Sequence, residues 1–502
     1  MAQPSNFVPL YLAPDLDPAW SKNPGLLVDA GDVVPSKRGT LKSWQCATDV
    51  GVTGFSEATY GKALKGAILK RIDGSARLFI GTKGRLLEGS IASGFLDRSK
   101  SGNYSANTSD WQFTSFGNVA IATNKYNAPQ MSIGSGPFVD LTGSPPKAQL
   151  CCTQNNFVML ANYDDGTNNY QDGWWCSALG NYAYWTPGIA YNCYNGRLLD
   201  TPGGIRALVP LRDGIVAYKD DSIYVGSFQG PPFGWAWRLV SDRVGCSSSS
   251  GVASTGDAHY FLHRTGIYKF DGFSGEPIGS PIDRFLFSKM VSVTNYATVQ
   301  AAADEYEDTV FWFFKEEDAA DASNLTLGLC YNTVSGQFGF IRYGWPTKYD
   351  NSVMRGVIPC SLADLSQWES GLGTLTNNIL TFGSDTTINL RRPKFGEVTA
   401  GAVTNYPYIR TGDIGGEVAN TRVTRFKPRF IACNAANLRE MYGYTKYSES
   451  DSYGTGTTFT ADATQRRWDG VVSGRLVQMY GELANQFELA GVTITSVQSG
   501  SE

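Results

Sequence analysis

Residues 67–88 read AILKRIDGSARLFIGTKGRLLE, and this stretch decides the fold class. Its apolar residues form three short runs, which are separated by Asp73-Gly74 and by Lys83-Gly84. An Asp-Gly pair between two apolar runs favours a β-hairpin, because both turn positions then tolerate a positive φ. The stretch therefore predicts successive antiparallel strands that are joined by tight turns.

The same pattern returns at residues 214–226, 260–272 and 379–390. One residue from the strongest strand of each unit gives the series Phe79, Ile121, Met159, Val216, Phe261, Trp312 and Leu380. The shorter gaps in this series are close to the ~40–50 residues of a four-stranded propeller blade, and insertions account for the longer ones. We predict an all-β fold, a β-propeller of six or seven blades, although a stack of β-sandwiches also spaces its strands evenly.

The composition changes at residues 396–416, which are rich in Gly and Thr. We therefore predict an N-terminal arm at 1–24, a β-propeller platform at 25–396 and a small, added C-terminal β domain at 397–502. Helical periodicity is almost absent, and only 283–290, 317–322 and 434–441 are expected to form short helices.

The formal net charge is -4 and the pI is near 5.5, so the free chain has no global basic field for tight, sequence-independent binding to duplex DNA. Neither a secretory signal nor an apolar stretch of ~18 residues is present, so we expect assembly in the cytoplasm. The nine cysteines contain no C-x-x-C pair, and we expect reduced, buried thiols rather than disulfides or metal ligands.

The sequence offers no readable catalytic centre. His259 and His263 lie on one face of their segment, but Tyr260 stands where a zinc protease would carry Glu, so packing or surface histidines are expected. The chain has no G-x-S-x-G elbow and no phosphate-binding G-x-x-x-x-G-K-[ST] loop. We therefore predict that the protein is not an enzyme and binds no metal or cofactor.

Several charged clusters are better explained as turns. The loop 162–169 fails the EF-hand pattern and is expected to be a turn with self-bonding Asn and Asp side chains. The carboxylates at 304–308 are expected in a solvated turn before a strand at 309–314 rather than as a glycosidase pair. The basic clusters Lys37-Arg38 and 391–394 are expected to be surface turns rather than DNA contacts, and the residues that contact DNA are unknown.

A family resemblance adds to this interpretation. It is carried by Trp111 to Asn124 (WQFTSFGNVAIATN), by Ala128-Pro129-Gln130, by 174–178 with 184–187, by 32–36 with 39–41, and by 266–272. These phrases resemble the tail nozzle proteins of short-tailed bacteriophages, the group of tail tubular protein B and packaged-DNA stabilisation proteins. The resemblance covers roughly residues 25–290, and the later part of the chain agrees only in general character.

The resemblance implies a structural role in a virion tail. It implies a homo-oligomeric ring of six copies below the portal and the head-to-tail adaptor proteins, with tail fibre or spike proteins as further partners. Genomic DNA would be retained in the distal channel and pass through it at ejection without tight binding, and a mild negative charge agrees with such a conduit.

Two rival functions stay open. One is a carbohydrate-binding or receptor-binding β-propeller, lectin-like or sialidase-like, in which Trp235 and Trp237 would stack on sugars; the other is a plain interaction scaffold of a cell. Under the nozzle hypothesis we expect Phe228, Phe233, Trp235 or Trp237 to contribute to a subunit or adaptor contact. The alternative is that these four residues pack onto their own blade.

Overall fold

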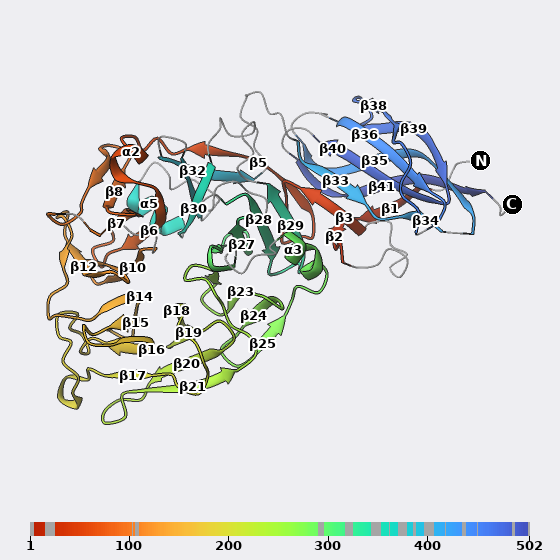
Figure 1. The fold of residues 1–502 in the computed structure, drawn as a ribbon. Helices are drawn as coiled ribbons and strands as arrows, with labels where there is room; N and C mark the ends of the chain where they lie inside the picture. The colour runs from red at the N-terminus through yellow and green to blue at the C-terminus, as the bar shows by residue number, and fades with distance from the viewer. Residues whose placement is uncertain are drawn as a thin grey trace.

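The computed structural model describes residues 5–15, 26–102, 104–105, 110–289, 296–316, 325–342, 353–360, 362–369, 379–384, 388–395, 406–416, 418–433, 438–448, 450–483 and 487–499. Nearly all regular structure in these ranges is β-strand (Figure 1). The helical elements within them are short: α2 (Glu57–Tyr60), a 3-10 turn (Ile189–Tyr191), α3 (Asp283–Lys289) and α5 (Leu362–Trp368).

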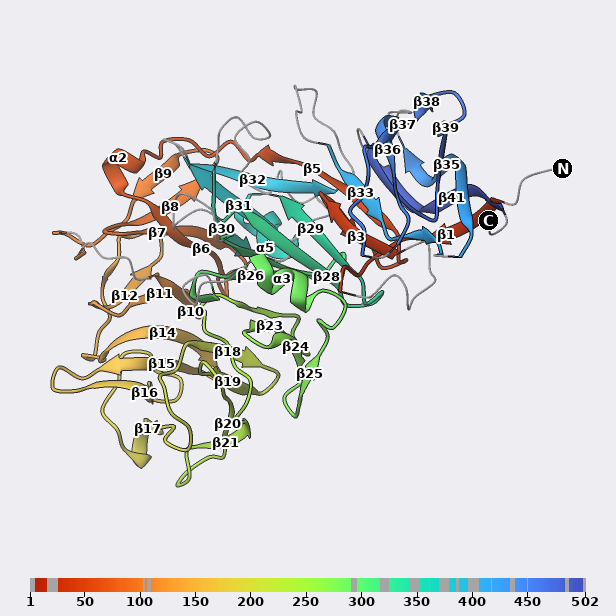
Figure 2. The same ribbon diagram turned by 45° about the vertical axis from the view of Figure 1, so that its right-hand side comes forward.

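Five separate four-stranded antiparallel sheets follow one another along the described chain, each in sequence order. They are β6 (Ala63–Lys70), β7 (Ala76–Thr82), β8 (Leu86–Ser90) and β9 (Gly94–Asp97); β10 (Gln112–Phe116), β11 (Val119–Asn124), β12 (Asn127–Ile133) and β13 (Val139–Asp140); β14 (Lys147–Gln154), β15 (Phe157–Asp164), β16 (Asn169–Cys176) and β17 (Asn195–Arg197); β18 (Ala207–Leu211), β19 (Gly214–Tyr218), β20 (Ile223–Phe228) and β21 (Trp235–Ser241); and β22 (Val252–Ser254), β23 (His259–His263), β24 (Gly266–Phe270) and β25 (Gly275–Pro277). They are stacked side by side in an arc as propeller blades (Figures 1 and 2).

Local chemistry explains these meanders. The turn between β6 and β7 contains Gly74 at φ +83°, a conformation that glycine adopts without strain. In the same turn the Asp73 carboxylate accepts a hydrogen bond from the Ser75 backbone N–H at 2.9 Å. The second strands β11 and β15 are buried almost throughout rather than on alternate residues, because neighbouring blades cover both of their faces.

Two further meanders belong to larger sheets. The strands β26 (Gln300–Asp304), β27 (Thr309–Phe314), β28 (Leu327–Asn332) and β29 (Phe338–Arg342) continue through β2 (Tyr11–Leu12), β3 (Leu26–Gly31), β33 (Tyr408–Thr411), β40 (Leu476–Leu483), β36 (Leu438–Lys446) and β37 (Thr457–Thr458), with β34 (Ile414–Gly415) beside β40. The strands β30 (Val353–Pro359), β31 (Ile379–Ser384) and β32 (Ile388–Phe395) continue through β5 (Leu41–Asp49), β41 (Phe487–Ser499), β35 (Asn420–Cys433), β39 (Arg467–Gly474) and β38 (Thr460–Asp462), with β4 (Val33–Pro35) beside β5 and β1 (Ser5–Pro9) beside β41.

The outer parts of these two sheets pack on each other as a C-terminal β-sandwich, in which β36 contacts β39 and β35 contacts β40. One hydrophobic core runs from the propeller strands into this sandwich, and it includes Tyr260, Trp312, Phe426 and Trp468. The blue strands of the sandwich in Figure 1 therefore share both hydrogen bonds and core with the propeller.

The first strands of the meanders form a closed series. The strands β6, β10, β14, β18, β22, β26 and β30 contact one another in that order, and β30 contacts β6. Gln300 joins the two ends, because its side-chain amide donates to the carbonyls of Leu64 at 3.3 Å and Arg355 at 3.2 Å, and its oxygen accepts from the Val357 N–H at 3.1 Å.

The all-β class and the propeller are confirmed, but the predicted count of six or seven blades is not. The described residues form five free-standing four-stranded blades, because the other two meanders hydrogen-bond onward into the sandwich. The boundaries 1–24, 25–396 and 397–502 stay a prediction. Strands from all three ranges take part in the two large sheets.

Of the expected helices, the one at 283–290 is confirmed as α3, and the segment 317–322 lies outside the described residues. The helix expected at 434–441 is wrong over its described part, because β36 begins at Leu438 and pairs with β40.

Candidate functional site

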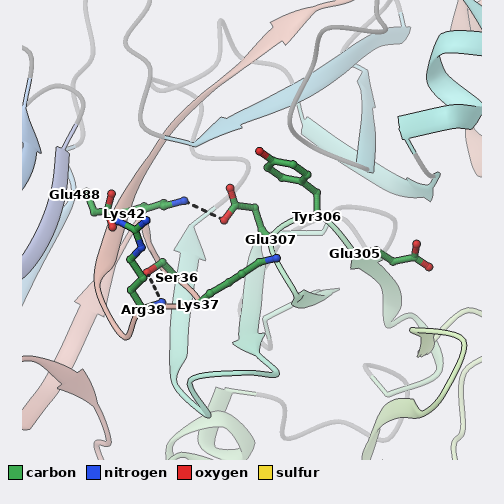
Figure 3. A pocket seen from close by; sticks show the side chains of 8 residues that line it. All are labelled: Ser36, Lys37, Arg38, Lys42, Glu305, Tyr306, Glu307 and Glu488. Carbon is green, nitrogen blue, oxygen red and sulfur yellow. Dashed lines mark hydrogen bonds and ion pairs between the residues drawn. The ribbon is translucent and has the colours of Figure 1, made fainter.

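A polar pocket of about 560 Å³ lies where the propeller meets the sandwich (Figure 3). Three segments supply its lining: the β4–β5 turn with the start of β5, the β26–β27 turn, and the first residues of β41. The side chains that line it are Ser36, Lys37, Arg38, Lys42, Glu305, Tyr306, Glu307 and Glu488.

The β4–β5 turn is held by its own polar groups. The Ser36 N–H donates to the carbonyl of Thr40 at 2.8 Å, and the Gly39 N–H donates to the carbonyl of Ser36 at 3.0 Å. Gly39 has φ +73°, which a residue with a side chain would adopt only with strain. The Thr40 hydroxyl donates to the Glu488 carboxylate at 2.7 Å and so fixes this turn to β41.

The β26–β27 turn is equally self-bonded. The buried Asp304 carboxylate accepts hydrogen bonds from the backbone N–H groups of Tyr306 at 3.0 Å and Glu307 at 3.3 Å. The Asn332 side chain donates to the carbonyl of Glu307 at 2.8 Å. These bonds position the lining side chains without any ligand.

Two ion pairs connect the turns across the pocket. Lys42 Nζ lies 2.9 Å from the Glu307 carboxylate, and Lys37 Nζ lies 2.6 Å from that of Asp308. Lys37 Nζ also lies 5.9 Å from the centroid of the Tyr306 ring. The pocket therefore presents fixed cations and carboxylates side by side, together with one aromatic ring.

The sequence predicts both the β4–β5 turn and the β26–β27 turn, but it does not predict that the two turns lie next to each other. Lys37-Arg38 and the carboxylates at 304–308 were expected in separate surface turns, and the structure confirms a turn at 37–38 and at 305–308, with β27 at the predicted Thr309–Phe314. The expectation is wrong for Asp304, which ends β26 and is buried because its carboxylate bonds to the backbone of the turn. What the sequence missed is that these turns face each other although they lie far apart in the chain. The Lys42–Glu307 pair spans 265 positions, so no local motif signals it.

The four predicted interface residues divide into two groups. Phe228, Trp235 and Trp237 pack inward: the Phe228 and Trp235 rings lie 4.8 Å and 5.6 Å from that of Phe157, and the Trp237 ring lies 5.7 Å from that of Trp174. Phe233, in the turn between β20 and β21, is 79% exposed. The interface role of the four stays a prediction, and Phe233 is the member that is open to a partner.

The two histidines are buried hydrogen-bonding residues in β23. His259 Nδ1 lies 2.8 Å from the Tyr218 hydroxyl, and its Nε2 lies 3.0 Å from the Pro210 carbonyl. His263 Nε2 lies 3.0 Å from the Asp221 carboxylate. Burial lowers the pKa of His259 to about 4, so its imidazole is neutral near pH 7. The packing role predicted for this pair is confirmed.

The acidic loop at 162–169 is a self-bonded turn, as predicted. The Asp164 carboxylate accepts from the Gly166 N–H at 2.8 Å, and the Asp165 carboxylate accepts from the N–H groups of Thr167 and Asn168 at 2.8 Å each. No grouping of three or more His, Cys, Asp or Glu that could hold a metal ion occurs among the described residues.

Seven cysteines are described, and all are buried free thiols: Cys151, Cys152, Cys176, Cys193, Cys246, Cys330 and Cys360. Burial raises the pKa of the Cys151 and Cys176 thiols to about 12, which makes them poor nucleophiles. The side chains of Cys46 and Cys433 lie outside the described set.

The surface turn expected at the basic cluster 391–394 is wrong, because these four residues form part of β32 and pair with β5. Their side chains lie outside the described set.

No helix in the described part of the chain is both long and apolar enough to span a membrane. No protein-family model and no curated protein matches the chain. Among solved structures it is similar to YCF48 bound to D1 peptide (12% identity, TM-score 0.39, covering 71% of this chain and 97% of that one) and to the Pan2 WD40 domain of Neurospora crassa (9% identity, TM-score 0.40, covering 70% and 95%). Likenesses as distant as these carry no argument about function.

Proposed function

We propose that this chain is a structural subunit of a short-tailed bacteriophage tail. In this proposal six copies form a nozzle ring below the portal and adaptor, and the ring makes the distal DNA channel. It retains the packaged genome and lets it pass at ejection. The protein would therefore act by assembly and not by catalysis.

The observation that carries the proposal, beside the sequence resemblance, is the continuity of the molecule. Two β-sheets and one hydrophobic core run from the propeller into the sandwich. Domains that meet only through a small surface usually move relative to each other, whereas shared sheets resist such motion. A subunit that must hold its place around pressurised DNA benefits from such a rigid body.

Trp111 begins one of the phrases that resemble the nozzle family, and its side chain joins two blades. Such a packing role agrees with the proposed structural function. Trp111 is fully buried, and its Nε1–H donates to the carbonyl of Thr82 at 2.9 Å, so the start of the second blade is tied to the first. Its ring lies 4.8 Å from that of Tyr104.

We also infer that the propeller has seven blades. This count adds the two meanders of the large sheets, β26–β29 and β30–β32 with β5, to the five separate blades. The closed series of first strands supports the inference. In the seventh blade the N-terminal strand β5 would supply the outermost strand and so close the propeller.

The rival carbohydrate-binding or receptor-binding function has less support at Trp235 than at Trp237. Trp235 is 5% exposed and so presents no free ring face to a ligand, whereas Trp237 is partly exposed and packs on Trp174.

The nozzle proposal can be tested by imaging. Antibody fragments raised against the purified chain are added to short-tailed particles from cells that produce it, and the particles are examined by cryo-electron microscopy. We expect labels in six-fold symmetry near the distal end of the tail, and their loss when the fragments are first incubated with the purified chain. Specific labels on a trimeric spike, at one copy per particle, or on no particle at all would contradict the proposal.

A further inference from the structure

We propose that the pocket between the β4–β5 and β26–β27 turns binds an uncharged, polyhydroxylated ligand, namely a saccharide unit. This inference goes beyond the nozzle role and does not depend on it. The volume of about 560 Å³ falls within the roughly 300–1,000 Å³ of small-molecule sites. The lining is polar, which disfavours an apolar ligand.

The charges in the pocket are balanced. The lining contains three cationic side chains, Lys37, Arg38 and Lys42, and three carboxylates, Glu305, Glu307 and Glu488. Since Lys42 is already paired with Glu307 at 2.9 Å, and Lys37 with Asp308 at 2.6 Å, a charged ligand would gain attraction at one group and meet repulsion at the next. A ligand without net charge avoids that repulsion.

The hydrogen-bonding pattern selects hydroxyl groups. Ammonium and guanidinium groups only donate, ionised carboxylates only accept, and a hydroxyl does both. Lys42 and Glu307 stand beside each other in the pocket (Figure 3), so neighbouring hydroxyls of one ligand could bond to both without rearranging the pair. A ligand that lacked closely spaced hydroxyls would displace water from the remaining donor and acceptor positions of this pair without replacing its hydrogen bonds.

Tyr306 supplies the remaining element of a sugar site. It is 50% exposed and stands at the edge of the pocket in Figure 3. Its ring offers an apolar face and a polar hydroxyl, which matches a pyranose with its C–H face and its hydroxyls. The hydrogen bond from its N–H to Asp304 at 3.0 Å fixes the turn before binding, so little ordering is required.

The test is saturation-transfer NMR on the purified full-length chain. The probes are neutral methyl glycosides of glucose, galactose, mannose, rhamnose and N-acetylglucosamine, with glucuronate and glucosamine as charged counterparts. Neutral oligosaccharides from bacterial surface polysaccharide are added to distinguish a free sugar from a cell-surface source. We expect transfer to at least one neutral saccharide and weaker transfer to the charged sugars.

Variants locate the binding. Tyr306→Ala should weaken it by up to about tenfold, the fold-change that corresponds to the upper range for an aromatic contact. Glu307→Gln should weaken it as well. Tyr126→Ala is the matched control, because Tyr126 is 53% exposed in the turn between β11 and β12 and should leave binding unchanged.

Thermal unfolding of each variant shows that it is folded, and Tyr306→Leu replaces Tyr306→Ala if the latter is not. The proposal is overturned if no neutral saccharide receives saturation, if the charged sugars bind more tightly, or if binding survives both pocket substitutions.

Discussion

Glu88 shows how single ionic residues hold neighbouring blades together. Its carboxylate accepts from Arg77 Nε at 2.6 Å and from Arg98 Nε at 2.8 Å, and Arg77 Nη1 in turn donates to Ser132 of the second blade at 2.9 Å. Burial raises the pKa of Glu88, but its bonds with Arg77 and Arg98 outweigh that effect and hold the pKa below its ordinary value. The carboxylate is therefore ionised at neutral pH.

Removing this carboxylate should destabilise the protein strongly. In Glu88→Ala the Arg77 guanidinium, whose side chain is 7% exposed, would keep its charge without a counter-ion. We expect the free energy of unfolding to fall by about 3–5 kcal/mol, the cost of breaking a buried pair from one side, as measured by urea titration.

The control for this substitution is Asp97→Ala. The Arg85–Asp97 pair has a similar separation of 2.9 Å, but both side chains are 31% exposed, so water can replace the lost partner. Its loss should cost only about 0–1 kcal/mol. Equal costs for the two variants would show that burial does not decide the strength of these pairs.

At the scale of elements, closure of the propeller depends on Gln300 in β26. Its amide bonds to Leu64 in β6 and to Arg355 and Val357 in β30, and thus joins three first strands. Gln300→Leu would leave buried backbone groups without partners, at about 1–3 kcal/mol for such a group. We expect faster amide hydrogen exchange in β6 and β30 and a lower free energy of unfolding.

Gln229→Leu provides the comparison for Gln300→Leu. The exposed Gln229 side chain donates to the Ser227 hydroxyl at 2.7 Å, so the same chemical change removes a bond at the surface. It should leave exchange in β6 and β30 unaltered. If both variants behaved alike, Gln300 would have no special part in closure.

The element scale also shows what the sequence could predict. The seven residues chosen from the strongest strands each lie in the second strand of a meander and have 0% exposure: Phe79, Ile121, Met159, Val216, Phe261, Trp312 and Leu380. Apolar runs and turn residues are local signals, so they located these strands. The helix expected at 434–441 failed because helix-favouring residues such as Leu438 and Met441 are drawn into pairing with β40, and tertiary pairing overrides local propensity.

Strand pairing between segments that lie far apart in the chain could not be predicted from the sequence. The joining of β5 to β32 and of β2 to β29 merges two meanders with the sandwich, and the residues concerned lie hundreds of positions apart. The pocket has the same origin, because Lys42 on β5 meets Glu307 only when the N-terminal strands close the propeller. Each turn was therefore predictable, whereas the site that they form together was not.

At the scale of the whole molecule, exposed aromatic residues point to surfaces that an assembly would cover. Phe233 is 79% exposed at the β20–β21 turn, while its neighbour Trp235 lies in the core and Phe228 packs against that core. A large apolar side chain on a supported turn is typical of interface anchors. In a closed homo-oligomeric ring, such a turn would contact the next subunit or the adaptor.

We therefore expect Phe233→Asp to prevent ring formation without unfolding the subunit. The exposed side chain makes little contribution to the monomer, so the thermal midpoint should stay near that of the parent chain. An Asp in a desolvated contact would be unpaired and should abolish incorporation into rings on an adaptor–portal platform, counted by cryo-electron microscopy.

Phe273→Asp, at a 71% exposed phenylalanine on the β24–β25 turn, tests whether any exposed aromatic has this effect. Rings that form normally with Phe233→Asp would remove this turn from the interface, and a shared defect would show that loss of surface aromatics, not this contact, blocks assembly.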